Sequence, residues 1–292
     1  MKITLTGSLG NIGKPLTQKL VEAGHEVTVI TSSTKTAAEI ETLGAKPAVG
    51  SVEDIDFLTH TFKGADVVYT MVPNNFGAAS MRKYIASIGQ NYADAIVNAG
   101  IQNIVNLSSI GANLDGGTGP IAGLHDVEGI LNKLNINIKH LRPAYFYTNF
   151  FNDVALIKNL GFTGSNFDEN TNMVLVHPKD IATTATTAIT TAFDGKTVQY
   201  IYSTEEKAGN IAKVLGNAIA KPDLNWVEFS DEQALDGMLQ AGLPAEIAKN
   251  YVEMGTAIRD GKLHVDFAKN KPQASETKLE DFAIEFAAKY NS

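Results

Sequence analysis

The chain has 292 residues, a formal net charge of -8 and no cysteine. Its 44% hydrophobic and 19% charged residues are ordinary for a soluble globular protein, and no run of lysine or arginine favours nucleic acid or a membrane surface as a partner. The absence of cysteine excludes disulfides, thiol nucleophiles and thiolate metal sites, and it fits a reducing compartment, so we expect a cytoplasmic location. No apolar run reaches the length of a membrane span, and no signal-peptide pattern precedes the first strand.

Over the first 140 residues, short apolar runs alternate with longer segments of helical periodicity. This alternation predicts an α/β fold in which a doubly wound parallel sheet has helices on both faces. The apolar runs are rich in valine and isoleucine and end at glycine, proline or serine, as buried parallel strands do. The strands are expected at Ile3–Thr6, Glu26–Ile30, Lys46–Val49, Asp66–Met71, Ile104–Leu107 and Ile136–Leu141.

The alternation weakens beyond Arg142, where longer helices and scattered short strands are expected. We place a boundary near residue 150, between a first domain (1–150) and a smaller, mostly helical substrate lobe (151–292) that is structurally continuous with it. The Thr/Ala tract between Ala182 and Ala192 lies in the second lobe. Its apolar residues recur at helical spacing, which predicts a buried helix.

A glycine-rich turn directly follows the first predicted strand and leads into the first helix. It reads GSLGNIG and places Gly7, Gly10 and Gly13 at a G-x-x-G-x-x-G spacing. Gly7 permits the sharp turn, Gly10 lets the backbone approach a pyrophosphate, and Gly13 lets the helix pack closely on the sheet. Because free amides and the positive end of the helix dipole meet here, the turn predicts that the first domain is a Rossmann domain that binds NAD(P).

The residues after the second predicted strand indicate which dinucleotide is preferred. An NAD site usually carries an acid here for the ribose hydroxyls, but none occurs between Val27 and Ala38. The hydroxyls of Ser32 and its neighbours and the charge of Lys35 suit a 2'-phosphate instead, so the expected cofactor is NADP, with NADPH favoured over NADH. A solvated lysine at the start of a helix is the alternative for Lys35, since the usual arginine is missing.

Four segments resemble those of the NmrA-like branch of the atypical short-chain dehydrogenase/reductase superfamily. They are the glycine turn, NIVNLSSIGA, GLHDVEGILNKLNINIKHLRPAYFYTNFF and VHPKDIA, and the similarity spans nearly the whole chain. The resemblance implies that the turn lines the pyrophosphate and that the end of the fourth strand lies beside the adenosine. It also implies that the ends of the fifth and sixth strands lie beside the nicotinamide and its ribose. One position departs, because the family often has Gly-Asp after the third strand where this chain has Gly50 and Ser51.

The cofactor-binding residues predicted from these features form one set. They are Gly7, Ser8, Leu9, Gly10, Asn11, Ile12, Gly13, Ser32, Lys35, Met71, Val72, Ser108, Pro143 and Tyr145. Tyr145 and Phe146 open an aromatic stretch at the junction of the lobes, and they are expected to form a flat apolar wall beside the nicotinamide. Phe150 and Phe151, in the same stretch, are expected in the core.

The proton donor of ordinary short-chain dehydrogenases, a tyrosine followed four residues later by lysine, is absent at all nine tyrosines. At the corresponding helix the chain has His125, and in NmrA-like quinone reductases a histidine lies in a similar place. Because histidine titrates near neutrality, His125 is the predicted catalytic residue, with a structural or ligand-contacting histidine as the alternative. The other histidines have no metal-ligand spacing, so no metal site is predicted. Asp180 is expected to be solvated or to cap the Thr/Ala helix.

These features favour an NAD(P)H-dependent oxidoreductase that transfers a hydride to a small quinone or carbonyl, with the proton supplied by His125 or water. The alternative is a non-catalytic NADP(H)-binding redox sensor of the NmrA type, which the missing Tyr-Lys pair favours. A nucleotide-sugar epimerase is disfavoured because its chemistry needs the same pair. The expected partner is a small-molecule substrate, with neither nucleic acid nor a membrane as a partner, and the sequence leaves a homodimer open.

Overall fold

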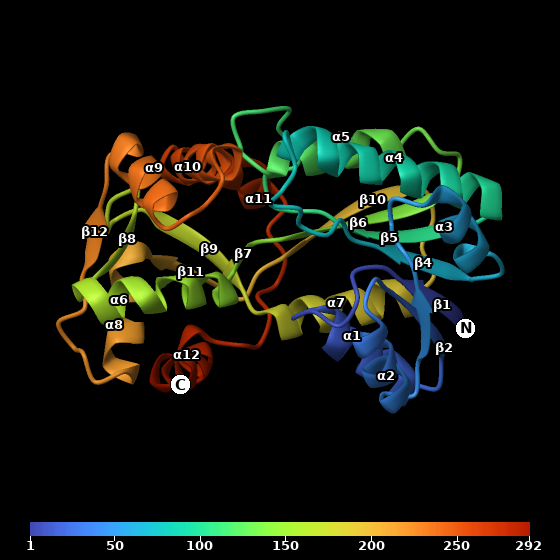
Figure 1. The fold of residues 1–292 in the computed structure, drawn as a ribbon, viewed down its shortest axis with the longest axis horizontal. Helices are drawn as coiled ribbons and strands as arrows, with labels where there is room; N and C mark the ends of the chain where they lie inside the picture. The colour runs from blue at the N-terminus through green and yellow to red at the C-terminus, as the bar shows by residue number, and fades with distance from the viewer.

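A seven-stranded parallel sheet is the largest element of the computed structural model, which describes residues 1–292 (Figure 1). Its strands follow the order β10-β6-β5-β4-β1-β2-β3, so the sheet is built outward from β1 in both directions. This order confirms the predicted doubly wound fold, and each of the six predicted strands is present with its ends within two residues of the prediction. The strands are β1 (Lys2–Leu5), β2 (Glu26–Thr31), β3 (Lys46–Val49), β4 (Val67–Thr70), β5 (Asn103–Leu107), β6 (Asn137–Pro143) and β10 (Lys196–Ile201).

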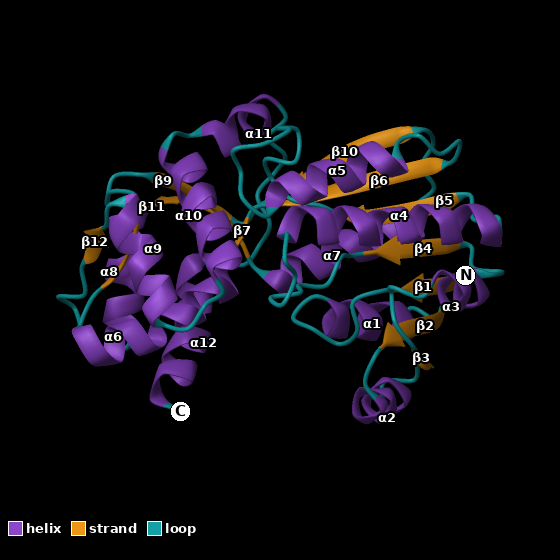
Figure 2. Ribbon diagram, turned by 45° about the horizontal axis from the view of Figure 1, so that its top comes forward, coloured by secondary structure: helices purple, strands orange, loops and turns teal.

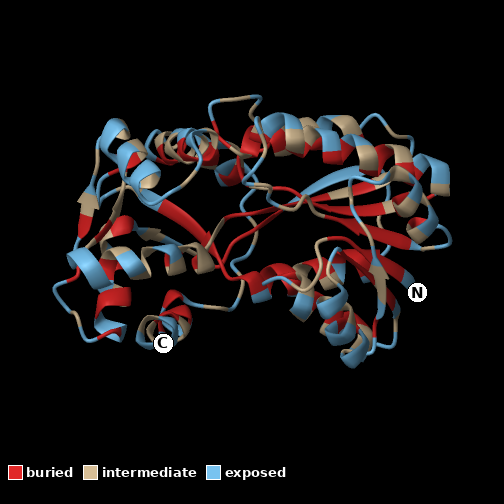
Figure 3. Ribbon diagram, viewed as in Figure 1, coloured by how far each residue is buried: buried red, intermediate tan, exposed pale blue.

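Helices cover both faces of this sheet (Figure 2). Successive strand residues point to opposite faces, so Tyr69 of β4 packs in the core shared with α1 and α7, whereas Val68 packs in the core shared with α3, α4 and α5. The strands between these two cores are largely buried (Figure 3). The helices on the first face are α1 (Gly13–Glu22), α2 (Thr34–Thr42) and α7 (Pro178–Thr190), and those on the second are α3 (Ile55–Phe62), α4 (Met81–Ala99) and α5 (Ile121–Leu131).

The second lobe mixes two small sheets with helices. Its strands are β7 (Tyr145–Phe146), β9 (Asn172–Val176) and β11 (Thr204–Lys207) in one sheet and β8 (Thr163–Ser165) and β12 (Trp226–Glu228) in the other. Its helices are η1 (Tyr147–Asp153), α6 (Val154–Leu160), α8 (Ala208–Ala218), α9 (Asp231–Gln240), α10 (Ala245–Arg259), η2 (Lys262–His264), α11 (Val265–Lys269) and α12 (Leu279–Asn291). Phe150 is buried in its core, as predicted, and Phe151 packs on Phe282 with ring centroids 5.2 Å apart.

After entering the second lobe, the chain returns to the large sheet of the first lobe. Helix α7 packs on α1 and β10 pairs with β6, so residues 178–201 lie with the large sheet although they follow residue 150. The division of domains at residue 150 stays a prediction. The expected Thr/Ala helix is α7, and its residues Ile181, Ala185 and Ile189 are buried. None of the helices is both long and apolar enough to cross a membrane.

Asp180 has neither of the roles expected for it. His177 caps α7, since its Nδ1 accepts a hydrogen bond from the amide of Lys179 at 3.0 Å. The Asp180 carboxylate is buried and accepts hydrogen bonds from the Ser203 hydroxyl at 2.7 Å and from the amide and hydroxyl of Thr277 at 3.2 and 2.9 Å. The prediction was wrong because these partners come from distant parts of the chain. Asp180 therefore fastens the segment before α12 to the start of α7.

We predict that Asp180→Ala lowers the free energy of unfolding by about 2 to 3 kcal/mol, because it leaves buried donors without their charged acceptor. Asp194→Ala is the matched control, since Asp194 is exposed and lies in a loop. Urea denaturation followed by circular dichroism measures both variants. Equal midpoints for the two would show that Asp180 does not hold this junction.

Candidate functional site

The backbone of the glycine turn has a shape that its glycines permit. Gly7 has a φ of +93° and Ser8 a φ of +56°, both in the left-handed region. A Cβ atom on Gly13 would lie 2.0 Å from the Ser8 carbonyl oxygen, so Gly13 lets the start of α1 pack against the turn itself. The sequence had predicted that Gly13 lets this helix pack on the sheet. A Cβ atom on Gly10 would meet nothing within 4 Å. The side of the turn at Gly10 is therefore open to a ligand.

The start of α1 suits an anion. Its N-cap residue, Ile12, offers no side-chain hydrogen bond to the first amides of the helix. Leu9 packs partly against the core and Asn11 is exposed. Because the first turn of a helix has unpaired amides and a partial positive charge, this uncapped end is suited to a phosphate group.

Hydroxyl groups tie the glycine turn to the end of β2. The Ser8 hydroxyl donates a hydrogen bond to Thr31 Oγ1 at 3.0 Å, and the Ser33 amide donates to the same oxygen at 3.2 Å. Ser33 caps α2, so its own hydroxyl accepts from the helix. Ser32 and Lys35 are exposed beside it, and no ion pair engages Lys35. A cation and a hydroxyl are thus free next to the turn.

Met71 joins the glycine turn to the end of β4. Its amide donates a hydrogen bond to Thr6 Oγ1 at 2.8 Å, and its carbonyl oxygen accepts one from the Tyr92 hydroxyl at 2.7 Å. Its side chain fills the space beside Gly7, where a Cβ atom would come within 2.3 Å of Met71 Cγ. Val72 follows and packs partly against the core on the other face. Both residues therefore lie where the first and fourth strands meet.

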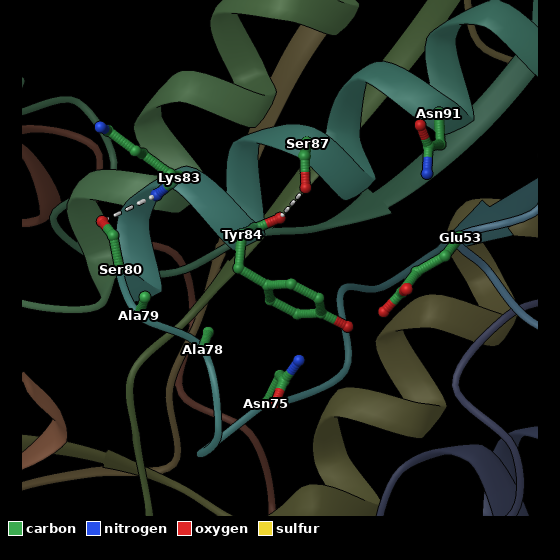
Figure 4. Close-up of a pocket in the computed structure, with 9 residues that line it drawn as sticks. All are labelled: Glu53, Asn75, Ala78, Ala79, Ser80, Lys83, Tyr84, Ser87 and Asn91. Atoms are coloured by element: carbon green, nitrogen blue, oxygen red, sulfur yellow. Dashed lines mark hydrogen bonds between the residues drawn. The ribbon is translucent and has the colours of Figure 1, made fainter. Parts of the chain in front are cut away.

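An open groove of about 670 Å³ lies between the loops that follow β3 and β4 and the start of α4 (Figure 4). The Tyr84 side chain stands in it with its hydroxyl directed toward Glu53 (Figure 4). Burial and the negative charge of Glu53 raise the pKa of Tyr84. Asp54 caps α3 by accepting from the amide of Phe57, which leaves Glu53 as the acid that faces the groove. The groove is lined by Glu53, Asn75, Ala78, Ala79, Ser80, Lys83, Tyr84, Ser87 and Asn91.

A second, mostly apolar pocket of about 220 Å³ lies between the two lobes. One side is formed by the segments that follow β4, β5 and β6, and the other by β9, α10 and η2. Ten of the fourteen lining residues are hydrophobic, which suits a flat apolar ligand, and Tyr145 faces this cleft as predicted. The lining residues are Asn74, Ser109, Ile110, Ile121, Ala144, Tyr145, Phe146, Asn149, Met173, Val174, Met254, Ile258, Leu263 and His264.

His125 lies on α5, one turn after the pocket residue Ile121, but it does not line the apolar pocket. Its Nδ1 lies 2.9 Å from the carbonyl oxygen of Ala112, so this nitrogen carries a proton and donates it to the backbone. The histidine is half-buried, with Nε2 left to other partners. Its role as a proton donor stays a prediction.

Glu128 belongs to a buried network that sequence reasoning missed. Its carboxylate accepts hydrogen bonds from the Ser108 hydroxyl at 2.6 Å and from Arg142 Nε and Nη2 at 3.0 and 2.6 Å. Arg142 Nη1 also donates to the Tyr200 hydroxyl at 3.0 Å and to Asp266 at 3.3 Å. Burial opposes the charge of Arg142, but the hydrogen bonds and charge of Glu128 outweigh it and raise the pKa of the guanidinium. Arg142 directly follows the predicted strand Ile136–Leu141, and no local pattern in the sequence identifies its partner.

The residues predicted for the nicotinamide side lie at the ends of β5 and β6. Glu128 engages the Ser108 hydroxyl, so Ser109 is the serine that reaches the apolar pocket. Pro143 ends β6, and Tyr145 follows it in the pocket wall. The structure thus brings the predicted residues to one edge of the sheet in two groups, one around the glycine turn and one around the apolar pocket.

Comparisons with known proteins extend over nearly the whole chain. The sequence profile of the NmrA-like family matches residues 1–280. The NAD(P)H azoreductase of Xenophilus azovorans is 22% identical over 253 residues, which are 86% of this chain and 85% of the azoreductase. An uncharacterised protein of Schizosaccharomyces pombe is 36% identical over 77 residues, so the match spans only 26% of that protein.

Solved structures share the fold. The NADPH complex of an NADPH-dependent quinone oxidoreductase from Escherichia coli has a TM-score of 0.84 at 17% identity, covering 97% of this chain and 99% of that one. The NADP(H) complex of Citrobacter sp. triphenylmethane reductase has a TM-score of 0.81 at 20% identity, covering 98% and 100% of the two chains. At these identities the likeness concerns the fold alone.

We predict that Gly10→Val weakens NADPH binding by about 100-fold or more, which is roughly 3 kcal/mol, because the new side chain occupies the open space at the turn. The fold should survive, since nothing lies within 4 Å of the new Cβ position. Gly237→Val is the matched control, because Gly237 is equally open but lies on α9, away from the turn. Calorimetric titration with NADPH and a thermal melt measure the two effects. Unchanged affinity in a folded Gly10→Val protein would exclude the turn as the cofactor site.

Proposed function

The chain belongs to the NmrA-like family, and from this premise we propose that it is an NAD(P)H-dependent oxidoreductase that reduces a small quinone or carbonyl. The observation that carries the proposal is the apolar pocket at the carboxyl edge of the sheet. Ligands of open α/β sheets bind at this edge, near the point where the strand order reverses. The similar proteins include an azoreductase, a quinone oxidoreductase and a triphenylmethane reductase, which supports a flat, conjugated substrate.

The cofactor fits the open side of the glycine turn, because Gly10 leaves space and α1 is uncapped. In the proposed arrangement the amides from Gly7 to Gly13 hold the pyrophosphate, and Met71 and Val72 lie beside the adenosine. Ser108, Pro143 and Tyr145 lie beside the nicotinamide and its ribose, next to the apolar pocket. When bound, the dihydronicotinamide supplies a hydride to a substrate in that pocket.

The apolar pocket selects the kind of substrate. Its volume of about 220 Å³ is smaller than that of most ligand sites, which favours a compound of one or two rings. Tyr145 and Phe146 provide an aromatic surface on which a planar ring can stack. Asn74 and Asn149 add amide groups that can orient a substrate oxygen. A small aromatic carbonyl or quinone satisfies all three features.

We predict a preference for NADPH over NADH of roughly 5- to 30-fold, as one or two charge-assisted hydrogen bonds to the 2'-phosphate would give. The supporting observation is that Ser32 and Lys35 are exposed and free beside the turn. Lys35→Ala should remove most of the preference. Lys46→Ala is the control, since this exposed lysine starts β3 at the opposite end of the strand from the site. Equal dissociation constants for the two cofactors in the unmodified protein would refute the assignment.

We predict that the protein oxidises NADPH in the presence of at least one compound from a panel of benzoquinones, naphthoquinones and aromatic aldehydes. The loss of NADPH absorbance measures the reaction. A reaction without substrate is the control. Phe146→Ala should raise KM by about 10-fold or more, because it removes part of the apolar wall. Tight binding of NADPH without oxidation by any compound in the panel would favour the sensor function.

A further inference from the structure

His264 is the one residue of the apolar pocket with an imidazole, the side chain that ordinarily titrates near neutral pH. The other polar side chains there, Asn74, Ser109 and Asn149, do not exchange protons in that range. Tyr145 also lines the pocket, but burial raises the pKa of its hydroxyl, so it is a much weaker acid than an imidazolium. A substrate oxygen that becomes negative in this pocket therefore has His264 as the most acidic side chain that lines it.

The position of His264 is fixed from both sides. It follows Gly261, whose φ of +69° turns the chain sharply after α10. The adjacent Leu263 is buried and packs so closely on Gly111 that a Cβ atom there would lie 2.6 Å from Leu263 Cδ2. Two residues later, Asp266 accepts a hydrogen bond from the buried arginine of the Glu128 network. His264 is therefore held at the pocket by its neighbours and not by its own ring.

The imidazole of His264 is available to a ligand. His264 is the N-cap residue of α11, but its imidazole forms no hydrogen bond within the chain, whereas Nδ1 of His125 is occupied by a backbone carbonyl. Burial lowers the pKa of His264, and the negative charge of Glu205 on β11 opposes part of this shift. Glu205 is itself ion-paired with Lys271, and Asp266 is directed to Arg142. No carboxylate is thus dedicated to His264, and its proton is readily given up.

We propose that His264 is a catalytic residue that donates a proton to the substrate oxygen, an assignment that rests on the proposed reductase function. For an aromatic aldehyde, the carbonyl carbon gains the hydride that the dihydronicotinamide supplies, and the π electron pair of the carbonyl moves to oxygen. The oxygen then forms a bond to the proton while the N–H bond of the imidazolium breaks. The products are the alcohol, the oxidised cofactor and a neutral imidazole, which takes a new proton from solvent.

The first test compares His264→Gln, His125→Gln and the unmodified protein with an aromatic aldehyde as substrate. We expect His264→Gln to lower kcat/KM by about 100- to 10,000-fold, the usual contribution of general acid catalysis. In the unmodified protein kcat/KM should fall as pH rises through the pKa of His264, because only the imidazolium carries the proton to be donated, and the variant should lose this dependence. His60→Gln is the control, since His60 is exposed on α3.

The second test does not depend on turnover. It measures binding of 1-naphthol, a planar phenol that resembles a reduced product, by calorimetry and by the NMR signal of His264. We expect 1-naphthol to shift that signal and to bind about 10-fold more weakly to His264→Gln, with no change in His60→Gln. If no aldehyde is reduced but these binding effects appear, the reductase function fails while His264 remains the residue that contacts the ligand oxygen. Unchanged binding together with an unchanged pH profile in His264→Gln, or a loss confined to His125→Gln, would overturn the proposal.

Discussion

The buried ion pair between Glu128 and Arg142 is the centre of a polar network that joins the large sheet to the second lobe. It connects α5 to β6, and through Arg142 it reaches Tyr200 on β10 and Asp266 on α11. An intact buried pair adds little net stability, because the loss of hydration offsets most of the attraction. Loss of one partner costs about 3 to 5 kcal/mol, because the remaining charge stays buried. The pair therefore fixes positions more than it adds stability.

Both rims of the apolar pocket are set by this network. Glu128 holds the Ser108 hydroxyl at the end of β5, so the following residue, Ser109, is directed to the pocket. Arg142 holds Asp266, which fixes the start of α11 two residues after His264. A change at the ion pair would therefore shift the sheet side and the lobe side of the pocket together.

The sequence predicted the parts of the fold that local pattern determines. The six strands and the glycine turn are recognised because their apolar periodicity and glycine spacing lie within short segments. β10 was missed because it is an edge strand. Its sequence, KTVQYI, is largely polar and its Val198 is exposed, so it has little of the apolar pattern of a buried strand. The role of Asp180 was missed for another reason, since Ser203 and Thr277 become its partners through the tertiary fold alone.

The glycine turn and the apolar pocket also differ in how much of each can be recognised from a short segment of sequence. At the glycine turn the predicted ligand surface is backbone, so its requirements appear as glycines at fixed spacing in one heptapeptide. The apolar pocket is formed by side chains from Asn74 to His264, contributed by elements of both lobes. No local pattern marks such a set, because each member is an ordinary residue of its own helix or strand. The cofactor is thus inferred from sequence with fewer steps than the proposed substrate, because only one side of the apolar pocket belongs to segments that also carry predicted cofactor-binding residues.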